Sequence, residues 1–279
     1  MFTIVTHHIP DLDAVTSVWL IKRFLPNWQD ANIAFVPAGE TLNKEIADSD
    51  SHILHVDTGF GILDHHQSDA YTCAAKKTYE YLQQKINRDE SWKDEAIERM
   101  VEVVNFYDHF REVTIADIMA DYHVFDLVSI FDGIKSAYTD DNAKIINFGL
   151  EILDMVYKVM QERVWAEEVL EREGTEFVSN WGKAIAFETI NDTVLKLAQK
   201  KGYILVVRKD PKKGYIRIKG NPLSKVDLTE KFKIFQKSDP HATWYLHPSK
   251  KLLLNGSTRN PNMKPTKLKL NQIIKILQK

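Results

Sequence analysis

Carboxylate and imidazole side chains are concentrated in two short segments near the start of the chain. The first runs from His7 to Asp13 and reads His-His-Ile-Pro-Asp-Leu-Asp; the second runs from Asp57 to His66 and ends in Asp-His-His. Each follows a short apolar run, which predicts the end of a buried parallel strand. Ligands of open α/β sheets bind outside the carboxyl ends of such strands. Mixed oxygen and nitrogen donors at that edge suit two divalent cations, so the pattern predicts a metal-dependent phosphoesterase.

The first segment offers three candidate metal ligands, His7, Asp11 and Asp13, on a predicted strand-to-helix loop. Pro10 restricts its own backbone and favours an extended residue before it, which shapes this loop. An imidazole combined with two carboxylates suits Mn²⁺, Zn²⁺, Fe²⁺ or Co²⁺ better than Ca²⁺. On this segment alone, the alternative is a polar loop in which Asp13 caps the following helix.

The second segment and one later residue could complete such a site. Asp57 directly follows a predicted strand, where a carboxylate is well placed to bridge two metals. Of the adjacent His65 and His66, one imidazole could bind metal while the other contacts the substrate, and Asp64 could orient an imidazole through a hydrogen bond. Asp108 closes a predicted amphipathic helix. Taken singly, Asp57 could be a turn residue and Asp108 a surface acid.

The elements that must position these residues alternate at first between strand and helix. Apolar runs predict strands over 2–5, 31–36 and 53–56, with helices over 14–24 and 42–47 between them. This order predicts parallel pairing with right-handed crossovers. The region that follows is mostly helical, with helices expected over 74–86, 94–106, 115–120 and 126–137.

The rest of the chain predicts a long helix and a second domain. Residues 142–173 carry an extended helical pattern that becomes highly charged and stops at Gly174. Strand-like runs follow over 183–187, 203–207, 215–218, 243–247 and 252–254, with helices over 192–200 and 270–277. We therefore expect an α/β protein: a parallel-sheet catalytic, metal-binding domain with a helical insert (1–140), a connecting helix (141–174) and a smaller basic α/β domain for substrate (175–279).

Composition limits the function classes. With 44% hydrophobic and 27% charged residues, the chain is typical of a soluble globular protein. No apolar run approaches the ~20 residues of a membrane span. The single cysteine, Cys73, and the lack of an apolar leader indicate a reducing cytoplasm.

The net charge of −2 hides a strong asymmetry. Residues 196–279 hold 21 of the 37 Lys and Arg but only 4 of the 39 Asp and Glu, which leaves 16 basic and 35 acidic residues in 1–195. A basic region of this kind favours binding of an anionic ligand. The alternative is a basic face that merely complements the acidic part of the chain.

Together these segments resemble the DHH phosphoesterase superfamily, which is named after its Asp-His-His motif. The resemblance implies two divalent metal ions, Mn²⁺ above all, with Mg²⁺ or Co²⁺ as alternatives. It implies one metal held by His7, Asp11 and Asp57 and another held by Asp13, Asp57, His65 and Asp108. It also implies that His66, beside Asp64, contacts the scissile phosphate.

The spacing of the motifs indicates which branch of the superfamily the chain resembles most. Asp57 and Asp64 are only seven positions apart, which is far closer than in typical members. This compression and the extension Asp-His-His-Gln are similar to the branch that contains the melanocyte proliferating gene family of RNA exonucleases. The Pro-Asp-Leu-Asp of the first motif is closer to RecJ-type nucleases and family II pyrophosphatases, so the substrate stays open at this point.

A segment near the end of the chain is similar to a strand–turn–strand of the same branch that faces the active-site cleft. The residues that match in type are His247, Asn255, Gly256 and Arg259. Arg259 could bind a phosphate with two hydrogen bonds, and backbone amides from Gly256 to Thr258 could form an anion-binding nest. Arg217, on a predicted strand of the basic domain, is a further candidate. Solvated hairpin tips are the alternative.

We therefore expect a cytoplasmic, two-metal, exonuclease-like hydrolase that cleaves phosphodiester bonds in short RNA or DNA or in a small nucleotide, away from membranes. An inorganic pyrophosphatase-like hydrolase and a non-catalytic nucleotide-binding module are the alternatives. The sequence leaves open the exact substrate, the polarity of cleavage, the physiological metal and whether the chain forms a homodimer.

Overall fold

The computed structural model describes residues 1–86, 93–257 and 259–278. The chain folds as two compact units, Met1–Gln161 and Glu162–Lys279. Each unit has its own sheet, and each is described by itself below.

The first unit is built on three parallel strands in the order β2-β1-β3. These strands are β1 (Thr3–His7), β2 (Asn32–Val36) and β3 (Ile53–His55). In register, Thr3 of β1 lies opposite Asn32 of β2 on one side and Ile53 of β3 on the other. Because all three strands point the same way, the loops that follow β1 and β3 leave the sheet at the same edge. The predicted parallel sheet is therefore confirmed.

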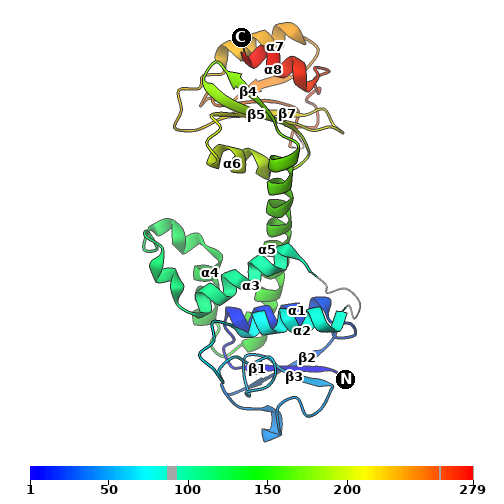
Figure 1. The fold of residues 1–279 in the computed structure, drawn as a ribbon, viewed down its shortest axis with the longest axis vertical. Helices are drawn as coiled ribbons and strands as arrows, with labels where there is room; N and C mark the ends of the chain where they lie inside the picture. The colour runs from blue at the N-terminus through cyan, green and yellow to red at the C-terminus, as the bar shows by residue number, and fades with distance from the viewer. Residues whose placement is uncertain (87–92, 258, 279) are drawn as a thin grey trace. The chain divides into compact units, whose positions relative to one another are not determined.

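Helices cover this sheet and form most of the rest of the unit. α1 (Leu12–Phe24) and α2 (Ala74–Ile86) pack against each other over one face of the strands (Figure 1). α1 is buried from Asp13 to Ile21, because α5 (Asn142–Arg172) also packs on it and Gly149 lies directly against Val15. α3 (Glu95–Asp108) follows, then the 3-10 turns η2 (Arg111–Thr114) and η3 (Asp121–Phe125), and α4 (Leu127–Ala137).

Two of the helices expected in this unit are corrected. Residues 115–120 form turns instead of a helix, because the segment buries none of its side chains fully and Met119 is 91% exposed. Residues 42–47 contain only the 3-10 turn η1 (Leu42–Lys44), in which Asn43 and Lys44 have left-handed backbone angles. The backbone N–H of Leu42 donates to His55 Nε2, so a tertiary contact determines the shape of this segment.

The long helix α5 (Asn142–Arg172) begins in the first unit and ends in the second. Its first part belongs to the core of the first unit, where Asp154 accepts a hydrogen bond from Trp19 Nε1 at 2.9 Å and the Tyr157 hydroxyl donates to Asp94. Its last turns belong to the core of the second unit, where Ala166, Val169 and Leu170 are buried. The boundary between the two units falls between Gln161 and Glu162, inside this helix.

The second unit is a six-stranded mixed sheet in the order β4-β5-β6-β7-β9-β8. Only β5 and β6 pair in parallel. The strands are β4 (Thr175–Ser179), β5 (Gly182–Glu188), β6 (Leu205–Lys209), β7 (Ile216–Gly220), β8 (Trp244–Leu246) and β9 (Leu252–Asn255), and the helices are α6 (Thr193–Lys200), α7 (Thr229–Ser238) and α8 (Leu270–Gln278). β4 and α7 were not expected.

The sheet of the second unit has an apolar core on each face. Along β5, Ala184 and Ala186 belong to the core that includes Phe235 of α7, whereas Ile185 and Phe187 belong to the core that includes α6. This is the period of two by which a strand serves both faces of its sheet. The α/β fold class is confirmed in both units. Among the described residues, none of the helices combines the length and hydrophobicity that a membrane span requires.

Candidate metal centre

The candidate site lies where β1 and β3 end. His7 is the last residue of β1, and Asp57 comes two positions after β3. Asp57 has a φ of +53°, and Ile9 in the loop after β1 has a φ of +52°. Left-handed backbone at a residue other than glycine costs energy, and for a β-branched residue such as isoleucine it is a true outlier. Such strain occurs mostly at functional sites, where the surrounding structure imposes it.

Three side chains form a first cluster at this edge: His7, Asp11 and Asp57. His7 Nε2 lies 3.2 Å from Asp57 Oδ2 and 4.0 Å from Asp11 Oδ2. His7 Nδ1 donates to the backbone carbonyl of His8 at 2.9 Å, so Nε2 faces the two carboxylates. One ligand atom from each residue falls within a sphere that a single metal ion could occupy.

A second cluster surrounds His65. Its Nε2 lies 3.4 Å from Asp57 Oδ1, 3.7 Å from Asp13 Oδ2 and 3.7 Å from Asp108 Oδ2. Asp57 thus contributes one carboxylate oxygen to each cluster, as a bridging carboxylate between two metals would. The structure therefore brings together all six residues that the sequence suggested as metal ligands.

Two buried atoms at the centre of this arrangement lack hydrogen-bond partners among the described residues. They are Asp57 Oδ1 and His65 Nε2, whose separation of 3.4 Å lacks hydrogen-bond geometry. A buried polar atom without a partner is costly, and native proteins rarely leave one without a reason. Oxygen and nitrogen atoms that converge on the same point are metal-ligand donors, so the residues present fit a divalent cation.

The electrostatics of the site indicate an excess of negative charge. Burial and the charge of Asp57 raise the pKa of Asp13 well above its usual range, and burial likewise raises the pKa of Asp108. The pKa of His65 rises to about 9, mainly because of Asp57. Burial alone would raise the pKa of Asp57, but the neighbouring imidazoles of His65 and His7 lower it. Carboxylates that repel one another in a buried cluster gain stability when a cation joins them.

The pKa of His7 also rises to about 9. Burial by itself would lower this pKa, but the hydrogen bond to Asp57 and the charge of Asp11 outweigh that effect. Both imidazoles that face the carboxylates therefore favour the protonated form, which is the charge that a bound cation would supply instead.

Asp11 and Asp13 each fix a helix as well. Asp11 is the N-cap of α1, and its Oδ1 accepts from the backbone N–H groups of Asp13 and Ala14 at 2.9 and 3.0 Å. The buried Asp13 instead accepts from Ala74 and Ala75 at the start of α2, at 2.7 Å each. The alternative in which Asp13 caps the helix that follows it is thus wrong, because Asp11 fills that position.

Asp64 holds the Asp-His-His loop together. Its carboxylate is fully buried and accepts from Phe60 N at 2.7 Å, from His66 N at 3.1 Å and from His66 Nδ1 at 2.7 Å. The Lys77 ammonium donates to the backbone carbonyl of Asp64. The His66 side chain is 56% exposed, so Asp64 fixes the direction of a ring that remains accessible.

Two supporting interactions were not anticipated. Asp48 accepts from the backbone of His55 at 2.8 Å and of Ile62 at 3.0 Å, and its Oδ1 lies 3.1 Å from His55 Nδ1. A Cβ at Gly61 would lie 2.3 Å from Asp48 Oδ2, so a larger residue there would displace this carboxylate. No sequence pattern around Asp48 predicts these contacts, which form only in the folded chain.

The other unanticipated residue is Asn142, the first residue of α5. Its Oδ1 accepts from the strained Ile9 N at 2.7 Å, and its Nδ2 lies 2.9 Å from His8 Nδ1. This side chain therefore holds the loop between His7 and Asp11 from a position more than a hundred residues away. The one sequence signal for Asn142 is its position at the start of a predicted long helix.

Among the candidate substrate-binding residues of the second unit, one is held in an ion pair and another is fully buried. Arg217 of β7 pairs with Asp192, which also binds Arg208 at 2.6 Å. Asn255 is fully buried; its amide donates to two backbone carbonyls and accepts from Thr266 N at 2.6 Å. Any part of Asn255 in substrate binding would therefore be indirect.

The remaining candidates lie in the turn after β9 and, for His247, directly after β8. Gly256 has a φ of +82°, and a Cβ there would collide with the Tyr215 ring, so this position requires glycine. His247 is exposed and hydrogen-bonds Ser249 at 2.8 Å, and Arg259 is exposed. Thr258, part of the suggested anion-binding nest, lies outside the described residues. A role in substrate binding stays a prediction for all of these residues.

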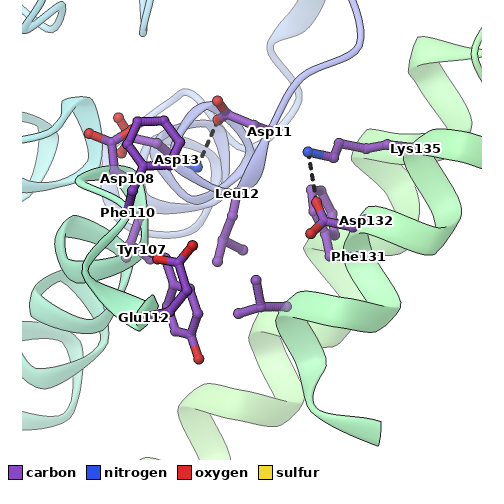
Figure 2. Close-up of a pocket in the computed structure, with 12 residues that line it drawn as sticks. Asp11, Leu12, Asp13, Tyr107, Asp108, Phe110, Glu112, Phe131, Asp132 and Lys135 are labelled. Carbon is purple, nitrogen blue, oxygen red and sulfur yellow. Dashed lines mark hydrogen bonds and ion pairs between the residues drawn. The ribbon is translucent and has the colours of Figure 1, made fainter. Parts of the chain in front are cut away.

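Two neighbouring cavities open on the metal centre. The first, of about 410 Å³, is lined by His7, Asp11, Asp57, His66 and Asp108, among others. The second, of about 220 Å³, lies between α1, the end of α3, η2 and α4 (Figure 2). Asp11 and Asp108 line both cavities, so the two spaces meet at the candidate ligands.

One family model matches the chain over residues 4–160, and its description is "ChrB, C-terminal domain". The match covers more than half of the chain. The chain belongs to the ChrB C-terminal domain family. All six candidate ligands, together with Asp64 and His66, lie inside the matched region. The family shown is thus ChrB, C-terminal domain, and the resemblance to one branch of the DHH superfamily stays a prediction based on motifs.

Two solved structures are distantly similar to this ChrB-family chain. One is described as a member of the s1p family of ribosomal proteins, DHH domain; it is 11% identical, with a TM-score of 0.35 over 99% of this chain and 85% of its own. Another is RecJ in complex with Mg²⁺ from Thermus thermophilus, also 11% identical with a TM-score of 0.35. The chain spans 49% of the length of that RecJ. Likeness at this level does not establish a shared fold or activity. No curated protein matches the sequence.

Proposed function

We propose that the first unit is a metal-dependent phosphoesterase that hydrolyses phosphodiester bonds in short nucleic acids or small nucleotides. The observation that carries this proposal is the shared Asp57, whose two oxygens face separate clusters while one of them, and His65 Nε2, lack hydrogen-bond partners among the described residues. Two adjacent cation sites joined by one carboxylate are typical of enzymes that act on phosphate esters.

The residues divide between two ions. His7, Asp11 and Asp57 would hold one, and Asp13, Asp57, His65 and Asp108 would hold the other. When bound, such cations supply Lewis acidity toward a phosphoryl oxygen and make a water molecule a stronger nucleophile at neutral pH. Mn²⁺ suits this mixture of carboxylates and imidazoles, and Mg²⁺ or Co²⁺ could replace it.

His66, oriented by Asp64, would contact the substrate instead of the metal ions. The His66 ring lines the larger cavity, and its Nδ1 is bound to Asp64. This bond places the Nδ1 proton on the side of Asp64 and leaves Nε2 for the substrate. In its doubly protonated form, an imidazole held in this way can donate from Nε2 to a phosphoryl oxygen as negative charge develops on that oxygen, without having to reorient during the reaction.

The charge distribution favours a polyanionic substrate. The basic residues of 196–279 exceed the acidic ones by 17, and exposed His247 and Arg259 belong to that region. Positive charge of this kind attracts phosphate esters and raises the rate at which they associate. An exonuclease-like action on short strands agrees with both the site and this charge.

The proposal is tested with metal-stripped protein. We expect calorimetry to show two Mn²⁺ ions per chain, and a panel of short RNA, short DNA, cyclic dinucleotide and pyrophosphate to reveal Mn²⁺-dependent release of product. Asp57→Asn should abolish turnover and remove both metal sites, whereas Asp50→Asn, at an exposed aspartate before β3, should change neither. Normal turnover by Asp57→Asn, or no bound metal in the wild type, would refute the assignment.

A further inference from the structure

The smaller cavity beside the metal centre contains groups that the proposed chemistry does not use. Its walls come from α1, the end of α3, the η2 turn and α4 (Figure 2). The polar groups outside the ligand set are Glu112, Asp132, Lys135 and the Tyr107 hydroxyl, and the apolar groups include Val128 and Phe131. Because Asp11 and Asp108 border both cavities, a substrate whose phosphate reaches the metal centre could extend into this one.

Phe110, on the wall of this cavity, combines an exposed aromatic ring with a strained backbone. Its ring is 75% exposed, and its backbone has a φ of +55°, which is unfavourable for a bulky residue. It follows the candidate ligand Asp108 by two positions and is the first residue before η2. Packing explains neither the strain nor the exposure. An exposed aromatic ring on the wall of a cavity is, however, the surface on which a planar base stacks.

Glu112 provides a second and independent observation. It lies on the same wall, and its Oε2, which is buried in this conformation, has no hydrogen-bond partner among the described residues, so that a rotation of the carboxylate would turn this oxygen toward a ligand. A carboxylate oxygen accepts hydrogen bonds only, so a ligand that satisfies it must present an N–H or O–H group. The exocyclic amino group of a nucleobase is such a donor, and Glu accepts from base amino groups in nucleic-acid complexes.

Lys135 completes the set on the opposite wall. Its ammonium pairs with Asp132 at 2.9 Å and points across the cavity in Figure 2. Among the described residues that line the two cavities, Lys135 is the only lysine or arginine. The cavity thus offers an aromatic face, an unsatisfied acceptor and a cation next to a candidate phosphate site.

We propose that this cavity is a nucleobase subsite, in which Phe110 stacks on the base and Glu112 accepts a hydrogen bond from its amino group. The inference rests on the proposed function and narrows the substrate to nucleotides that place an amino-bearing base beside the phosphate that is cleaved. A base with an oxo group at that position would turn an acceptor toward the Glu112 carboxylate, so adenine is preferred over hypoxanthine.

The test compares three dimers in the presence of Mn²⁺: a 5′-phosphorylated adenosine dinucleotide, its inosine counterpart and the abasic sugar–phosphate dimer. Phe110→Ala should raise KM for the adenosine dinucleotide by about tenfold, which lies within the roughly five- to 160-fold that stacking on one ring contributes, and should leave the abasic dimer unchanged. Phe110→Tyr should behave as the wild type. Glu112→Gln should remove the preference for adenosine over inosine. Phe125→Ala, at a ring on η3 that is 83% exposed and does not line the cavity, is the matched control.

A second measurement separates this inference from the proposed function. Ligand-observed NMR on the metal-stripped protein should show adenosine bound more strongly than inosine, and Phe110→Ala should lose this binding. Cleavage with no effect of Phe110→Ala on the adenosine dinucleotide would refute the subsite and leave the phosphoesterase intact. No cleavage together with adenosine binding that depends on Phe110 would refute the phosphoesterase and retain the subsite. Absence of both would refute both.

Discussion

Replacement of Asp13 by alanine tests the link between the metal centre and the fold. The Asp13 carboxylate is buried and accepts two hydrogen bonds of 2.7 Å from the first backbone N–H groups of α2. Alanine would leave both donors buried and without a partner. Each such donor costs about 1–3 kcal/mol, which gives a loss of roughly 2–6 kcal/mol in the free energy of unfolding for Asp13→Ala, reduced by relief of the repulsion between Asp13 and Asp57. This is a large part of the roughly 5–15 kcal/mol that typically stabilises a domain.

Asp11→Ala is the matched control, because Asp11 also accepts two backbone hydrogen bonds and is also a candidate ligand. Its side chain is 43% exposed, so water can replace it, and the loss of an N-cap costs only about 0.5–2 kcal/mol. Urea unfolding of the metal-stripped variants measures both values, and calorimetry with Mn²⁺ should show weaker metal binding in each. If Asp13→Ala were as stable as Asp11→Ala, or bound Mn²⁺ normally, the double role of Asp13 would be wrong.

Three further predictions concern pH, metal and the loop after β1. Hydrogen bonds to His55 and Ile62 outweigh burial and lower the folded-state pKa of Asp48, so the stability that the Asp48 carboxylate contributes is present above about pH 4, the unfolded value, and is lost as the pH falls through the folded pKa. Asp48→Asn should therefore reduce the fall in the free energy of unfolding toward low pH in urea titrations from pH 3 to 7. An unchanged fall would contradict the assignment. Mn²⁺ at a hundred times its dissociation constant should stabilise the wild type by about 2.7 kcal/mol per site in thermal melts, with no gain in Asp57→Asn; an equal gain in both would place the metal elsewhere. Asn142→Ala should weaken Mn²⁺ binding by about tenfold with little loss of stability, whereas Asn142→Asp, which keeps the acceptor for Ile9, should recover part of the affinity in the same calorimetric assay.

Much of the candidate site could be predicted because its residues sit at the ends of strands. Apolar runs before His7 and Asp57 identify β1 and β3, and parallel pairing then places both loops at one edge of the sheet. The same periodicity identified α1, α3 and the long α5. It failed for α7, whose sequence is rich in lysine, and for residues 115–120, where a helical spacing has no surface to pack on.

The supporting contacts could not be predicted, because they join residues whose separation along the chain carries no signal. Asn142 reaches Ile9 across 133 positions, and Asp13 reaches Ala75 across 62. The choice of Asp11 as the N-cap of α1, which leaves Asp13 for α2, depends on how α2 packs beside α1. Glu112 and Phe110 look like ordinary turn residues until the fold places them on the wall of a cavity.

The sequence by itself thus determined the chemical identity of the donors, the strand ends that carry them and the α/β class, because donor type and hydrophobic period are local properties. Tertiary structure decided which oxygen of Asp57 faces which cluster, that His65 Nε2 stays without a hydrogen-bond partner among the described residues, and that a second cavity adjoins the ligands. These features depend on distances between elements far apart in the chain, and the packing of α1, α2 and α3 against one another sets those distances.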